Sequence, residues 1–139
     1  MSNWTHVAGI IRMDTIRCIV PMPDFDELIG KEVHFGDETE VWDDADRSPD
    51  KYLPMGDEGS LKKSVWINPD EDYTAAYVIS IFGDLRDHHS AEEIIEWFKK
   101  KVTEIEEGEL GWIRQAVITV WNEFSNKNIS WQFAKGEDE

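Results

Sequence analysis

The densest group of residues that could do chemistry is the run Asp84-Leu85-Arg86-Asp87-His88-His89, between a predicted strand and a predicted helix. Carboxylate and imidazole side chains together suit divalent metals such as zinc or manganese. Adjacent histidines point apart, however, and no cysteine or suitably spaced histidine completes a tetrahedral set. We therefore expect neither a metal nor a cofactor. The residues that remain as an alternative small-ligand corner are Asp84, Arg86, Asp87, His88 and His89.

Other signatures of an enzyme are missing from the sequence. The single cysteine, Cys18, lies in an apolar run, which is typical of a small buried side chain rather than a nucleophile. There is no glycine-rich phosphate loop, no Gly-x-Ser-x-Gly turn and no His-Glu-x-x-His helix. The acidic stretches that start at Asp44 and Asp70 lack the glycine and the glutamate that a calcium loop requires. We expect a protein that is not an enzyme.

Negative charge is the most distinctive property of the chain. The formal net charge at pH 7 is −16, and residues 24–58 alone contain 13 acidic and three basic residues. Such a surface repels nucleic acids and anionic membranes and attracts basic surfaces, with an association that weakens as salt rises. We therefore expect a basic protein partner and no direct binding to nucleic acid or membrane.

Aromatic side chains inside the acidic segment indicate how this partner would be held. Trp42 is followed by Asp43 and Asp44, and Tyr52 lies two residues after Asp50. Large rings among carboxylates suit recognition of a Lys- or Arg-rich surface, with the rings as anchors and the acids for steering. In a plainer interpretation, the rings fasten the loop to its own core. The predicted partner-binding residues are Asp37, Glu38, Glu40, Trp42, Asp43, Asp44, Asp46, Asp50 and Tyr52.

The elements that must position these residues follow from the spacing of apolar side chains. Alternation predicts strands over residues 4–13, 61–67, 73–82, 112–121 and 129–133. The run 90–93 (Ser-Ala-Glu-Glu) has the pattern of a capping box, and apolar residues at steps of three and four predict a helix from there to Gly108. A short helix is expected over 24–30, and residues 43–60 have the composition of a loop.

The order of these elements predicts one α+β domain over residues 1–136, with an acidic insert at 24–60 and a disordered tail at 137–139. Without the insert, the order is that of the ferredoxin-like split β-α-β arrangement, a two-layer sandwich, with an added C-terminal strand. One long helix covers only part of one sheet face. We therefore expect the insert or another protein to cover the opposite face, because large apolar patches are seldom left exposed.

Composition and size together favour a binding function. With no secretory leader and no intrachain disulfide, the chain is expected in the cytoplasm, or in the host cytoplasm if it is viral. We expect a non-catalytic acidic inhibitor that occupies a basic, nucleic-acid-binding surface of another protein, its carboxylates standing in for phosphates. In composition and size the chain is similar to the small acidic inhibitors that phages use against host nucleases and defence complexes. Two alternatives stay open: a small-molecule-binding or regulatory module, and a structural subunit that forms a homo-oligomer through an open sheet face.

Overall fold

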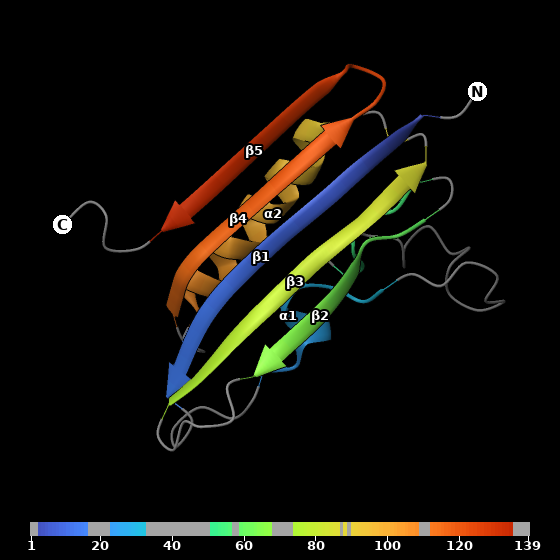
Figure 1. Ribbon diagram of the computed structural model, residues 1–139. Coiled ribbons are helices and arrows are strands. Elements are labelled where there is room, and N and C mark those ends of the chain that lie inside the picture. Colours follow the sequence, from blue (N-terminus) through green and yellow to red (C-terminus); the bar gives the residue numbers. More distant parts are fainter. Residues whose placement is uncertain are drawn as a thin grey trace, which may run out of the picture.

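The fold is a single antiparallel sheet with helices on one side. The computed structural model describes residues 3–16, 23–32, 51–56, 59–67, 74–86, 88, 90–108 and 112–134. Their elements are β1 (Trp4–Ile16), α1 (Phe25–Leu28), β2 (Lys62–Ile67), β3 (Thr74–Arg86), α2 (Ala91–Glu107), β4 (Trp112–Asn122) and β5 (Lys127–Ala134). The strand order is β2-β3-β1-β4-β5, and every neighbouring pair is antiparallel (Figure 1). This confirms the mixed α+β class.

The core lies between the sheet and its helices, and both helices are on the same side of the sheet (Figure 1). Successive side chains of a strand point to opposite faces, so Ile79 and Ile81 are fully buried while Phe82 is 45% exposed. Burial of one such large apolar side chain contributes about 1.5–3 kcal/mol. The largest fully buried side chains are Tyr77, Phe98, Ile11, Met13, Ile29, Leu53, Leu61, Ile79, Ile81, Leu85, Ile94 and Ile105.

The α2 helix begins and ends where the sequence predicts. The Ser90 side chain accepts a hydrogen bond from the Glu93 backbone N at 3.2 Å, and Gly108 is the C-cap. The expected capping box is only half formed among the described residues, because the Glu93 carboxylate lies 3.8 Å from His88 Nε2 instead. No helix in the described part of the chain has the length and apolarity needed to cross a membrane.

The short helix α1 depends on packing for its stability. The Asp24 side chain caps it by accepting a hydrogen bond from Asp26 N at 3.0 Å. Phe25 meets Tyr77 edge to face, with ring centroids 5.4 Å apart. Lys63 on β2 forms an ion pair with Asp26 and donates to the Gly30 carbonyl at 2.8 Å. These contacts hold the start of the acidic insert against β2 and β3.

The end of the acidic insert is also fastened to the fold, although the sequence predicts a loop there. A parallel bridge joins Lys31 to Tyr52, with Leu53 N donating to the Lys31 carbonyl at 2.9 Å. Two glycines let the chain approach β3 closely. A Cβ atom on Gly56 would lie 2.4 Å from the Arg86 carbonyl oxygen, and one on Gly59 would lie 2.2 Å from that of Asp84. The segment 51–56 is therefore held in place beside β3.

The sheet face opposite the helices is partly open. Trp66 on β2 is 56% exposed, and Phe82 on β3 points to the same face. On β1, Ala8 is exposed while Val7 is buried, so this strand is covered mainly on its helix side. The central residues 33–50 of the acidic insert and the predicted tail 137–139 lie outside the described residues.

Candidate functional site

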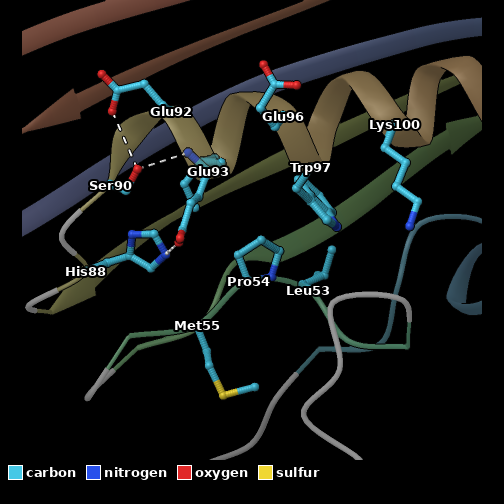
Figure 2. A pocket seen from close by; sticks show the side chains of 11 residues that line it. Leu53, Pro54, Met55, His88, Ser90, Glu92, Glu93, Glu96, Trp97 and Lys100 are labelled. Atoms are coloured by element: carbon cyan, nitrogen blue, oxygen red, sulfur yellow. Dashed lines mark hydrogen bonds and ion pairs between the residues drawn. The ribbon is translucent and has the colours of Figure 1, made fainter.

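The strongest candidate site is a groove between α2 and residues 53–55 (Figure 2). Leu53, Pro54 and Met55 form one wall, and Ile94 and Trp97 of α2 contribute to the other. The groove has a volume of about 640 Å³. Volumes of roughly 300–1,000 Å³ with mostly apolar linings are typical of binding pockets. Gly56 and Gly59, which approach β3 closely, also set the position of the Leu53–Met55 wall.

Carboxylates from the first half of α2 form the rim of this groove. The side chains of Glu92, Glu93 and Glu96 are 61%, 76% and 72% exposed. Their contacts with Lys127, His88 and Lys99 are long, at 3.8, 3.8 and 3.4 Å. Exposed pairs of this kind are screened by solvent and contribute little, so the carboxylates can still attract a cationic ligand. Figure 2 shows Glu93 pointing toward His88, while Glu92 and Glu96 project from the other edge of α2.

A buried polar network holds His88 at one end of the groove. Its carbonyl oxygen accepts hydrogen bonds from Thr5 Oγ1 at 2.8 Å and from Asn122 Nδ2 at 3.1 Å. Thr5 on β1 and Asn122 on β4 are both fully buried, and Asn122 Nδ2 also donates to Thr5 Oγ1 at 2.9 Å. Two strands therefore fix the backbone from which the His88 side chain enters the groove. Sequence reasoning missed both residues, because neither differs from an ordinary polar residue of a strand.

Trp97 is the most informative residue of the groove. Its side chain is 7% exposed, and among the described residues its buried indole Nε1 has no hydrogen-bond partner. Buried tryptophan N–H groups usually have an acceptor. Figure 2 shows the indole extending from α2 toward Leu53, with its nitrogen at the far end of the ring. Sequence reasoning missed Trp97, although its position three residues after Ile94 indicates the apolar face of the helix.

Comparison with known proteins finds no relative. No family model, no curated protein and no solved structure matches the chain. The function must therefore be argued from the residues themselves.

The predicted ligand corner is divided between two sides of the sheet. Leu85 is fully buried on the helix side, so its neighbours Asp84 and Arg86 lie on the open face. His88 instead lines the groove beside α2. Asp87 and His89 lie outside the described residues.

Asp84 is used in an ionic network with His6. His6 Nδ1 lies 2.6 Å from Asp84 Oδ1, and His6 Nε2 lies 2.9 Å from Glu123 Oε2. Hydrogen bonds to Glu123 and Asp84 raise the pKa of His6 above 6.5, and the same bond to His6, together with one from Trp4 N, lowers the pKa of Glu123. No group of three or more His, Cys, Asp or Glu residues in the described ranges is arranged to hold a metal ion. The network thus joins β1, β3 and the β4–β5 turn.

The predicted partner-binding residues are mostly outside the described part of the chain. Tyr52 is the exception, and it is 8% exposed and packs against Met55. This position favours the plainer interpretation for Tyr52, an anchor of the segment on its own fold. The residues of this prediction that lie outside the described ranges are Asp37, Glu38, Glu40, Trp42, Asp43, Asp44, Asp46 and Asp50.

A smaller hollow of about 200 Å³ lies on the open sheet face beside Trp66. Two arginines line it, but both are already engaged. Arg12 Nε donates to Gln115 Oε1 at 3.2 Å, and Arg114 forms an ion pair with Asp14 at 3.0 Å. The groove beside α2 is larger than this hollow, so it is the stronger candidate.

Proposed function

We propose that this protein is a non-catalytic acidic binding protein that occupies a basic, nucleic-acid-binding surface of another protein. The observation that carries the proposal is an apolar groove with a rim of exposed carboxylates, one wall of which belongs to the acidic insert. An inhibitor of this kind competes with nucleic acid for the same lysine and arginine side chains of the partner.

The two components of the groove contribute differently to binding. Carboxylates on the rim and a net charge of −16 accelerate encounter with a basic surface and fix its orientation. The apolar walls supply affinity, because burial of apolar surface stabilises a complex by about 25 cal/mol per Å² before the costs of association. Acidic residues alone give a salt-sensitive but unspecific attraction. The groove adds a defined place for the partner.

A surface that binds nucleic acid is the most suitable target. Such surfaces present Lys and Arg side chains spaced to contact phosphates, and carboxylates form the same charge-assisted hydrogen bonds with them. Residues 24–58 include 13 acidic residues, so the negative charge of the chain is not confined to the three rim glutamates. The partner would therefore contact both the groove and the insert.

We also infer that the fold is the ferredoxin-like split β-α-β arrangement with an added strand. The support is that four strands follow the order β2-β3-β1-β4, with α1 between β1 and β2 in the chain and α2 between β3 and β4. The fifth strand lies beside β4. This arrangement hosts many unrelated functions, so it does not itself identify the activity.

The proposal is tested by capturing proteins from a lysate of the source organism or its host at low salt and eluting them with rising salt. We expect a basic nucleic-acid-handling protein that elutes early, because added salt screens exposed charges. The variant Glu92→Gln/Glu93→Gln/Glu96→Gln, which keeps side-chain size but removes three rim charges, should retain several-fold less of it.

A control variant tests whether weaker capture results from the loss of the rim carboxylates or from the lower net charge. The variant Glu104→Gln/Glu107→Gln removes two exposed carboxylates that lie neither on the groove nor in the acidic insert. It should capture nearly as much partner as the unchanged protein. Equal capture by the rim variant, or bound proteins that are neither basic nor released by salt, would contradict the proposal.

A further inference from the structure

We propose that the groove beside α2 is an anchor site for a bulky apolar side chain of a basic partner segment. This inference rests on the proposed function and adds the chemistry of what enters the groove.

The walls of the groove suit a large apolar side chain. Leu53 and Ile94 are almost completely buried, while Pro54 and Met55, which also line the groove, are partly exposed. Methionine adapts its shape to different apolar groups because its side chain is unbranched and flexible. The opposite walls come from α2 and from a segment pressed against β3, so the groove exists before a partner arrives and little ordering cost remains to be met on binding.

Trp97 contributes its indole ring to the lining of this site. Its Nε1 atom is fully buried and has no hydrogen-bond partner among the described residues, so it does not reach a ligand in the preformed groove. A carboxylate on the ligand is disfavoured, because Glu92, Glu93 and Glu96 would repel it.

The charges around the groove also favour one orientation of the partner segment in it. Glu93 lies beside His88 at one end, and Lys100 lines the other end (Figure 2). Cationic side chains of the partner are therefore favoured toward the Glu93 end. A segment with lysine or arginine next to a bulky apolar residue suits both the apolar walls and the acidic rim.

Three blocked octapeptides test this chemistry by isothermal titration calorimetry. The first has the sequence Lys-Arg-Lys-Leu-Phe-Lys-Arg-Lys, the second replaces Leu-Phe by Ser-Ser, and the third replaces every Lys and Arg by Gln. We expect the first to bind at least about tenfold more tightly than either of the others, because it alone supplies both the anchor and the charge.

Protein variants test the individual contacts with the first peptide. Met55→Lys places a cation in the groove and should weaken binding about tenfold or more. Trp66→Phe alters an exposed ring on the opposite sheet face and should leave affinity unchanged. Thermal melting of each variant checks that the fold is intact.

The outcomes separate this inference from the function on which it rests. If the Leu-Phe and Ser-Ser peptides bind equally and in a salt-sensitive way, the anchor is wrong and acidic recognition stands. If the uncharged peptide binds as tightly as the charged one, acidic recognition is wrong and the anchor stands. Absence of binding by all three peptides overturns the anchor, while lysate capture independently tests the function. If Met55→Lys binds the first peptide like the unchanged protein, the groove is not the anchor site.

Discussion

At the scale of single residues, His6 shows how the fold uses its carboxylates internally. Both ring nitrogens face carboxylates, Asp84 at 2.6 Å and Glu123 at 2.9 Å, so the imidazolium form is favoured. Asp84 belongs to β3 and Glu123 to the β4–β5 turn, so both are far from His6 in the sequence. They contribute to stability, whereas the rim glutamates of α2 have only long, exposed ion pairs.

The raised pKa of His6 predicts a definite pH dependence of stability. A group whose pKa is higher in the folded state stabilises the fold fully below its unfolded value of 6.5, and this contribution disappears as pH rises through the folded value. The unfolding free energy of the unchanged protein should therefore exceed that of His6→Gln most near pH ~6, and the difference should shrink toward pH ~9. Urea unfolding at several pH values measures it. A difference that grows with pH would contradict the network.

Some residues of the site were predictable from sequence and others were not. The role of Ser90 was predictable, because an N-cap side chain accepts a hydrogen bond from a backbone N–H three residues later. The sequence does not predict the roles of Asn122, His6 and Trp97, because these roles depend on residues brought together by strand pairing and helix packing. The sequence-predicted corner Asp84–His89 combined residues that lie on different sides of the sheet, because Asp84 and Arg86 belong to β3 while His88 follows the end of that strand.

At the scale of elements, periodicity was sufficient for the strands and for α2. Alternation predicts β3 and its two faces, and steps of three and four predict α2 up to Gly108. Residues 51–56 were predicted as loop because their order comes from long-range contacts with Lys31 and β3, which composition does not show. That segment forms one wall of the groove.

The glycines beside β3 give a prediction for this wall. Gly59 has φ +83°, and a Cβ atom there would lie 2.2 Å from the Asp84 carbonyl oxygen. Gly59→Ala should lower the unfolding free energy by about 1–3 kcal/mol through backbone strain and the steric clash. Gly108→Ala is the control, because its φ of −77° is one that alanine adopts easily, and it should cost less. Equal unfolding midpoints for Gly59→Ala and the unchanged protein in urea would show that the wall is not held as described.

At the scale of the whole molecule, charge and shape lead to the same surface. The net charge of −16 predicts a basic partner from sequence alone, but only the folded chain shows an apolar groove with carboxylates on its rim. The open sheet face with Trp66 is a separate surface, on the opposite side from α2. A partner that docks at the groove leaves that face uncovered.

The central claim is that this protein and nucleic acid occupy the same surface of the partner. The most direct measurement is fluorescence anisotropy of a labelled oligonucleotide bound to the captured partner while this protein is titrated in. We predict that anisotropy falls to the value of the free oligonucleotide, and that Glu92→Gln/Glu93→Gln/Glu96→Gln displaces it only at higher concentration. A rise in anisotropy, which would report a ternary complex, would contradict the account.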